Sequence, residues 1–235
     1  GLYTMSSFDE VKFDYTTVLN MDTMSMSTKI LSKPLPDFSE AEMAKLVHDG
    51  YTGKFETDHL TPTVPVGEDF ILELFRGPTS AFKDVALSML PRLMTASKEK
   101  LGVDDEIMIL TATSGDTGKA AMEGFCDVPG TKIIVFYPHG GVSAVQQAQM
   151  ATQAGENVCV CAVRGNFDDA QTGVKKIFSA VSKDQLLEGK GAWRVHGGGF
   201  AGCVQALMPT DYFPTYKEDM EKAFGGGSCR EIRLV

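Results

Sequence analysis

Apolar residues in the middle of the chain follow two alternating patterns. Short apolar runs typical of buried strands are each followed by a turn and then by apolar residues at helical spacing. Strands are expected at 70–75, 107–111, 132–137 and 157–163, and the helices that follow them at 81–94, 119–125, 143–154 and 168–178. Strands that alternate with helices over short loops predict an α/β fold with a mostly parallel sheet and flanking helices.

The two ends of the chain have a different texture. Before Thr63 the sequence is mixed and rich in methionine, with one predicted helix at 39–49 that Ser39 would cap. After Ala180 the sequence becomes rich in glycine, and the patterns there predict a strand at 192–195, a helix at 216–224 and a further strand at 229–235. We therefore expect two parts, an α/β region over 1–178 and a small α+β segment over 179–235.

Composition narrows the class of protein. The 235 residues are 43% hydrophobic and 23% charged, as in folded proteins, and their net charge of −9 disfavours nucleic acid and anionic membranes as partners. No apolar run approaches the ~20 residues of a membrane-spanning helix, and the first residues lack the features of a secretion signal. We expect a soluble, cytoplasmic protein.

The cysteines indicate neither disulfides nor a metal site. The five are odd in number and scattered, at Cys126, Cys159, Cys161, Cys203 and Cys229. Cys159 and Cys161 lie two apart in a predicted strand, so both should face the same side of a sheet, which favours packing over metal binding. Reduced thiols and no metal are the expectation.

Lys83 is the first candidate for chemistry. If Thr79 or Ser80 caps the predicted helix, Lys83 lies in its first turn among apolar neighbours. The positive end of the helix dipole and partial burial both favour the neutral amine, which attacks carbonyls to form Schiff bases. The alternative is a solvated lysine beside Asp84, and spacing alone favours this alternative.

A second candidate is the turn TSGDTG at 113–118, between a predicted strand and helix. Small residues and a helix N-terminus make a site for a carboxylate or a phosphate, here with Ser114, Gly115, Asp116 and Thr117. The spacing of its glycines and the Ala after Lys119 exclude a Walker A loop. The alternative, an ordinary turn capped by Ser114 or Asp116, is equally compatible with the sequence.

Four segments together resemble threonine synthases, in the same order. They are LELFRGPTSAFKDVA at 72–86, LTATSGDTGKAA at 110–121, IVFYP at 134–138 and GNFDDAQ at 165–171. The opening Gly1-Leu2-Tyr3 also resembles the start of that family. The resemblance covers residues 1 to about 178.

The resemblance implies a lyase that depends on pyridoxal 5'-phosphate and has the tryptophan-synthase-β-like fold, PLP fold type II. Such an enzyme of threonine biosynthesis converts O-phospho-L-homoserine and water to L-threonine and phosphate. By this resemblance Lys83 would bind the cofactor and move protons, while Ser114, Gly115, Asp116 and Thr117 would hold the substrate.

The sequence departs from the family in two respects. Arg76 stands where a histidine is usual before Gly-Pro-Thr. The family's later glycine-rich loop for the cofactor phosphate, and its residue near the pyridine nitrogen, have no match in this chain. The resemblance therefore implies an incomplete fold and an incomplete cofactor site, and a lyase that is inactive if the missing parts are required.

The remainder, about residues 181–235, resembles the C-terminal end of galactokinases. The segment EGKGAWRVHGGGFAG at 188–202 and VQA at 204–206 carry this resemblance. It implies two alternatives to the lyase. One is a sugar kinase that uses ATP, although the kinase motifs found upstream in that family are absent, and the other is a non-catalytic chimeric fragment.

Overall fold

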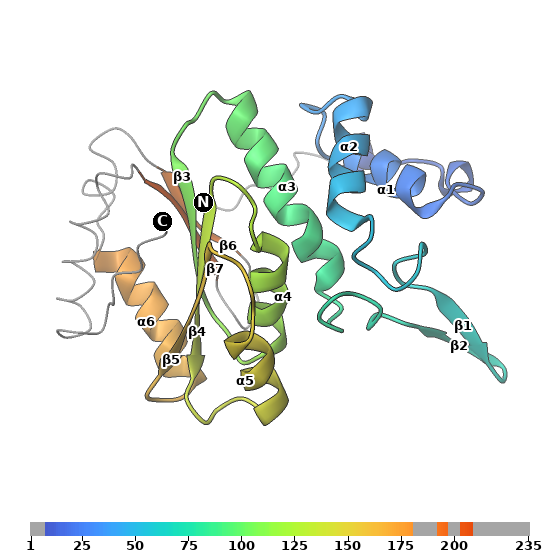
Figure 1. Cartoon of the computed structure of the whole chain (residues 1–235). Helices are drawn as coiled ribbons and strands as arrows, with labels where there is room; N and C mark the ends of the chain where they lie inside the picture. The colour runs from blue at the N-terminus through green and yellow to red at the C-terminus, as the bar shows by residue number, and fades with distance from the viewer. Residues whose placement is uncertain (1–7, 181–191, 197–202, 209–235) are drawn as a thin grey trace. The chain divides into compact units, whose positions relative to one another are not determined.

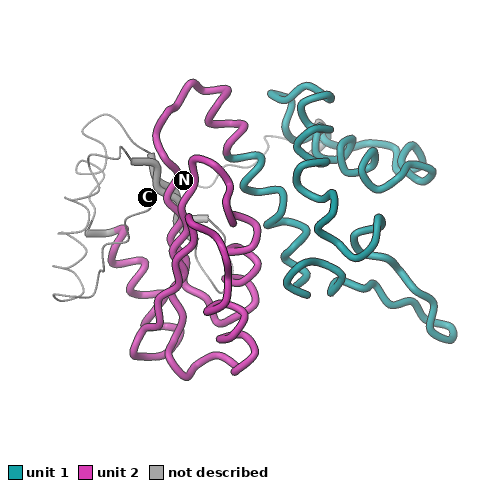
Figure 2. Tube along the Cα trace, viewed as in Figure 1, with its two compact units in different colours: residues 1–94 teal, residues 95–235 magenta. Residues whose placement is uncertain are grey.

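The chain divides into two units, residues 1–94 and 95–235 (Figure 2). The structure is a computed structural model that describes residues 8–180, 192–196 and 203–208. Within these residues, no helix combines the length and the hydrophobicity that crossing a membrane requires. The division between an α/β region and a C-terminal segment near residue 179 stays a prediction.

Short helices dominate the first half of unit 1. Two 3-10 helices, Phe8–Val11 and Tyr15–Thr17, precede α1 (Thr23–Ser32) and α2 (Glu40–Tyr51). The predicted helix and its Ser39 cap are confirmed, since Ser39 and Glu42 form a reciprocal capping box at the start of α2.

An exposed hairpin follows in unit 1. Strands β1 (Thr63–Val66) and β2 (Asp69–Leu72) pair antiparallel, with Val64 opposite Ile71. The prediction of a buried strand at 70–75 is wrong, because the strand ends at Leu72 and the side chain of Phe70 is 74% exposed. The reason is its pairing: a strand in a two-stranded hairpin lacks the covering layers that bury a strand of a larger sheet.

Helix α3 (Asp84–Lys100) begins three residues later than the predicted helix at 81–94. The preceding turn closes through a hydrogen bond from the Ser80 N–H to the Gly77 carbonyl, and Ser80 has a left-handed φ of 57°. A residue with this φ does not continue a right-handed helix, so α3 starts only after the turn.

A five-stranded sheet forms the centre of unit 2, in the order β5-β4-β3-β7-β6 (Figure 1). The strands are β3 (Glu106–Ala112), β4 (Thr131–Pro138), β5 (Val158–Val163), β6 (Ala192–His196) and β7 (Cys203–Met208). Strands β3, β4 and β5 run parallel, whereas β7 pairs antiparallel with β3, and β6 antiparallel with β7. The predicted α/β fold with a parallel sheet is confirmed for β3 to β5, as is the strand predicted at 192–195.

Helices cover both faces of this sheet. Figure 1 shows α6 (Phe167–Ala180) on one side, and α4 (Asp116–Phe125) and α5 (Ala144–Ala151) on the other. On the α6 side, Leu110 of β3 packs in one buried cluster with Val174 and Ile177 of the helix. The helices predicted at 119–125, 143–154 and 168–178 are confirmed with shifted ends.

Several predictions lie outside the described residues. These are the glycine-rich cluster at 197–202, the helix at 216–224 and the strand at 229–235.

Candidate functional site

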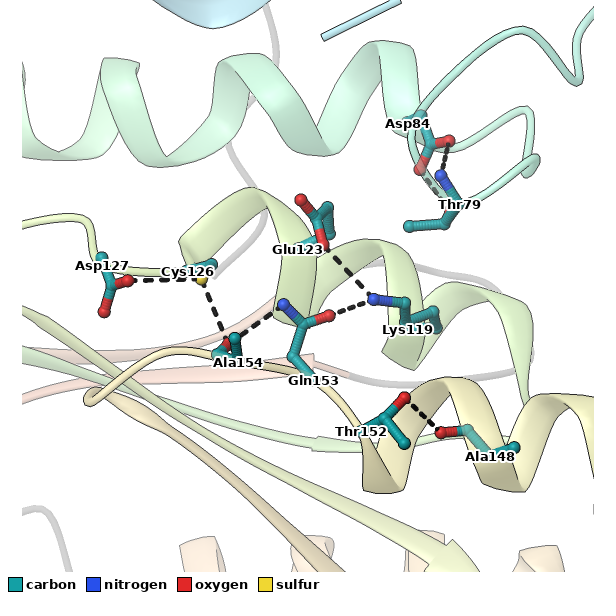
Figure 3. A network of polar contacts seen from close by, with 10 residues as sticks. All are labelled: Thr79, Asp84, Lys119, Glu123, Cys126, Asp127, Ala148, Thr152, Gln153 and Ala154. Carbon is teal, nitrogen blue, oxygen red and sulfur yellow. Dashed lines mark hydrogen bonds and ion pairs between the residues drawn. The ribbon is translucent and has the colours of Figure 1, made fainter.

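The turn before α3 closes on a buried carboxylate. Asp84, the first residue of the helix, is 2% exposed and accepts two hydrogen bonds from Thr79 (Figure 3). The Thr79 N–H lies 2.8 Å from Oδ2, and the Thr79 hydroxyl lies 2.5 Å from Oδ1. A Cβ on Gly77 would collide with this carboxylate, so the turn requires glycine there.

Lys83 lies between this turn and the helix. Its carbonyl accepts the first helical hydrogen bond, from the Leu87 N–H at 2.8 Å, so Lys83 precedes the first turn of α3. The expectation that Lys83 lies within that turn, with Thr79 or Ser80 as the cap, is therefore wrong. The reason is that the Thr79 side chain binds Asp84 and that Ser80 is left-handed.

The Lys83 side chain is half-buried and lies against an aromatic ring. Its Nζ is 4.7 Å from the centroid of the Phe82 ring, within the range of a cation–π contact. Phe82 is itself 61% exposed, so this apolar neighbour lies at the surface. The Asp84 carboxylate, the partner of Lys83 in the alternative interpretation, instead binds Thr79.

A buried threonine organises the second candidate, the turn between β3 and α4. The Thr113 hydroxyl accepts hydrogen bonds from the N–H groups of Gly115 (3.0 Å) and Gly118 (2.8 Å), and donates to the Gly115 carbonyl at 3.1 Å. A Cβ on Gly118 would collide with the Thr113 side chain. The sequence predicts that the small residues of this turn let a ligand approach the backbone. In the structure, Gly118 instead lets the Thr113 side chain approach the backbone of the turn.

The residue at the N-cap of α4 is Gly115, with a φ of 144°, which has no side chain to cap the helix, and the Thr113 hydroxyl instead accepts the N–H of Gly118, the third residue of α4. The alternative interpretation, a turn capped by Ser114 or Asp116, is therefore wrong, because the Thr113 hydroxyl binds the backbone of the turn instead. Ser114 and Asp116 are exposed and Thr117 is half-buried.

This turn has the properties of a site for an acid group. The N–H groups of Asp116 and Thr117 are the first in α4, where no preceding carbonyl of the helix can accept them. These N–H groups form the positive end of the helix dipole, which favours a carboxylate or a phosphate. Ser114, Asp116 and Thr117 are accessible in this turn, whereas Gly115 is buried under the Gln146 amide.

The sequence did not identify Gln146 as part of this turn. Its side-chain amide donates to Asp116 Oδ1 at 2.8 Å, and its Oε1 accepts the Ser143 N–H at 3.1 Å. A Cβ on Gly115 would collide with the same amide. The capping-box pattern of Ser143 and Gln146 is visible in the sequence, whereas the contact with Asp116, thirty residues away, is not.

Lys119, one turn into α4, differs from Lys83 in its partners. Its Nζ lies 3.3 Å from Glu123 Oε2 and donates to Gln153 Oε1, which joins α4 to the residues after α5 (Figure 3). The side chain of Lys119 is 12% exposed. This ammonium has a structural role, which makes Lys119 a matched control for Lys83.

The comparisons with known proteins agree on one family of relatives, although no family model matches the chain. The chain is 42% identical to the threonine synthase of Pseudomonas aeruginosa over 142 residues, which are 60% of this chain and 30% of the relative. It is 38% identical to that of Saccharomyces cerevisiae over 164 residues, 65% of this chain and 31% of the relative. Human threonine synthase-like 1 is 35% identical over 149 residues, 61% of this chain and 20% of the relative.

Solved structures give the same result for the fold. The PLP-bound threonine synthase of Brucella melitensis superposes with a TM-score of 0.64 at 37% identity, covering 70% of this chain and 35% of that one. The yeast enzyme gives 0.67 at 32% identity, with 75% and 37% covered. The chain thus has part of the threonine synthase fold, PLP fold type II, and spans between 20% and 37% of the length of these relatives. Nothing in these comparisons supports the galactokinase resemblance of 181–235, which stays a prediction.

Some of the described residues have the chemistry needed to bind pyridoxal phosphate, and others do not. Lys83 offers a half-buried primary amine for the cofactor aldehyde, and the turn at 114–117 suits an acid group of a substrate. The glycine turn at Gly165 does not fit the cofactor phosphate, because the Asp169 carboxylate fills it and accepts the Asn166 N–H at 2.8 Å. The aldehyde end of the cofactor thus has a candidate partner, and this turn is not a phosphate loop.

Proposed function

We propose that this chain carries part of a threonine-synthase-type active site, in which Lys83 binds pyridoxal 5'-phosphate. The observation that carries the proposal is the likeness to a PLP-bound threonine synthase, at 37% identity and a TM-score of 0.64. The turn at 114–117 supports the second half of the proposal, that Ser114, Gly115, Asp116 and Thr117 bind the acid group of O-phospho-L-homoserine.

Each residue has a role that follows from its geometry. The two hydrogen bonds from Thr79 to Asp84 fix the backbone next to Lys83, which limits the positions that the Lys83 Nζ can reach. The Nζ would hold the cofactor and accept or return a proton there. The bound cofactor would supply an electron sink, which the side chains of a protein lack.

The second turn would hold the substrate. Its backbone N–H groups and the dipole of α4 would bind an acid group without a positively charged side chain, while the Asp116 carboxylate is held by the Gln146 amide. Thr113 keeps the turn in one shape before a ligand arrives, because its hydroxyl ties Gly115 to Gly118. A preformed turn lowers the entropic cost of binding.

The complete reaction would convert O-phospho-L-homoserine and water to L-threonine and phosphate. It would need a loop for the cofactor phosphate, which the turn at Gly165 does not provide. We therefore assign cofactor and substrate binding to this chain, and the full turnover to a site that such a loop completes.

A spectral titration tests the proposal. Pyridoxal phosphate added to the purified chain should acquire the absorbance band of a lysine-bound cofactor, and Lys83→Ala should abolish it. Lys119→Ala is the matched control and should keep the band. Equal bands in Lys83→Ala and the wild type would contradict the proposal. Phosphate release from O-phospho-L-homoserine, measured in the same samples, then separates binding from turnover.

A further inference from the structure

Two cysteine side chains lie next to each other on β5, the edge strand of the described sheet in unit 2. Cys159 and Cys161 lie two residues apart on β5, and their sulfur atoms are 3.9 Å apart. Alternate residues of a strand point to the same face, so the strand itself brings the two side chains together. This distance is close to contact between two sulfurs.

The surroundings of the pair are apolar and partly open. Cys159 lies opposite Ile134 and Cys161 opposite Phe136 of β4, on the face of the sheet that α6 covers. Both cysteines are only half-buried. Among the described residues, β5 is the edge strand of the sheet and pairs with β4, and the partial exposure of both cysteines leaves them accessible to small molecules.

The two thiols affect each other's ionisation. The hydrogen bond from the Cys159 thiol lowers the pKa of Cys161 to about 7, against the opposing effect of burial. Cys126, the other cysteine whose side chain is described, has its pKa raised, first by burial and then by the charge of Asp127. The thiolate is the reactive form of cysteine, so Cys161 is the more reactive of these two at neutral pH.

We propose that Cys159 and Cys161 form a redox-active dithiol, which a peroxide oxidises to a disulfide within β5. The Cys161 thiolate attacks one oxygen of hydrogen peroxide, the O–O bond breaks, and Cys161 sulfenic acid and hydroxide form. The Cys159 sulfur then attacks the sulfenic sulfur, the S–S bond forms and the S–O bond breaks. The released oxygen leaves as water with the Cys159 proton, so two thiols and one peroxide give one disulfide and two waters.

The strand geometry makes this disulfide reversible. Residues two apart on a strand have Cα atoms ~6.4–6.8 Å apart, at the long end of the ~4.4–6.8 Å range of disulfides, and their Cβ atoms, which point the same way, lie farther apart than the ~3.5–4.5 Å that a disulfide requires. The strand must tighten for the sulfurs to bond, which favours return to the dithiol. We therefore expect glutathione to regenerate both thiols.

Peptide mass spectrometry tests the proposal on the full chain. Trypsin separates 133–164, which contains Cys159 and Cys161, from 120–132, which contains Cys126. The protein is treated with hydrogen peroxide, blocked with N-ethylmaleimide and digested. The variant Cys203→Ser/Cys229→Ser, run in parallel, removes the other two thiols as partners.

In both proteins, peptide 133–164 should lose two hydrogens and take up no maleimide, whereas 120–132 should keep one maleimide. Glutathione added before blocking should restore two maleimides on 133–164. Two maleimides on 133–164 after peroxide, or a disulfide from either cysteine to Cys126, would overturn the proposal.

Single variants separate the proposed mechanism from general thiol oxidation. In Cys159→Ser, Cys161 should accumulate as sulfenic acid that dimedone captures, because the second thiol is missing. Cys159→Ala removes the donor as well, so alkylation of Cys161 at pH 7 should slow by at least about tenfold. Unchanged alkylation in Cys159→Ala, with an unchanged circular dichroism spectrum, would contradict the interaction between the two thiols.

Discussion

Helices α3 and α4 begin in similar ways but are closed by different groups. Each follows a turn that contains a threonine, and each has an aspartate as its first residue. In α3, Asp84 is buried and its carboxylate binds the Thr79 backbone and hydroxyl. In α4, the neutral hydroxyl of Thr113 binds the turn, while Asp116 is exposed and accepts from Gln146.

The group that closes each turn determines whether the N-terminus of the helix that follows is already occupied by a carboxylate. The carboxylate of α3 already occupies the positive end of its own helix, so this turn serves to fix the residue next to it, Lys83. The turn of α4 is held by a neutral group, which leaves its first N–H groups available to an added acid group. This difference is the basis on which we propose Lys83 as the amine that binds a carbonyl and the turn of α4 as the site for an anion.

The largest effect is expected for Asp84→Ala. The Thr79 N–H and hydroxyl would lose charge-assisted hydrogen bonds while remaining buried, which should lower the free energy of unfolding by about 3 kcal/mol. Asp116→Ala, at the same position of α4, should cost less than about 1 kcal/mol because its carboxylate is exposed. Urea unfolding followed by circular dichroism measures both values. Similar decreases in the free energy of unfolding of the two variants would show that Asp84 does not stabilise its turn more than Asp116 does.

A smaller loss is expected for Thr113→Val, which keeps the shape of the side chain. The N–H groups of Gly115 and Gly118 would lose their acceptor, at a cost of about 2 kcal/mol. Thr113→Ser keeps the hydroxyl and should retain most of the stability. Hydrogen exchange at the two glycine amides reports on the turn directly, and unchanged protection in Thr113→Val would contradict the role of the hydroxyl.

The smallest effect concerns Gln146. Gln146→Ala should lower the stability by about 1 kcal/mol, because it removes the bond to Asp116 and one half of the capping box. A double-mutant cycle with Asp116→Ala should give a coupling of about 0.5 kcal/mol or more. Additive effects would mean that Gln146 acts only as a cap of α5.

Comparing the apolar runs at 70–75 and 107–111 shows what the spacing of apolar residues can and cannot predict. The runs at 70–75 and 107–111 both predict buried strands, yet β2 is exposed and β3 is buried. Strand β3 has a neighbour on each side and helices on both faces, whereas β2 has β1 alone. The residue types determine that a strand forms, but the number of strands that pair with it depends on distant parts of the chain.

The candidate site shows the same limit at the level of single residues. The turn at 113–118 was predictable from its small residues between a strand and a helix. Gln146 was not, because its contact with Asp116 joins residues thirty positions apart. The start of α3 was misplaced because the left-handed Ser80 and the bond between Thr79 and Asp84 decide it, and neither follows from the spacing of apolar residues.

Reductive labelling tests directly the proposal that Lys83 is the amine that binds pyridoxal phosphate. The chain is mixed with the cofactor, reduced with borohydride and digested with trypsin. A modified Lys83 resists cleavage, so we expect one labelled peptide, 77–92, and none in Lys83→Arg. Label spread equally over other lysines such as Lys119, or no label at all, would show that Lys83 is not the amine that binds the cofactor.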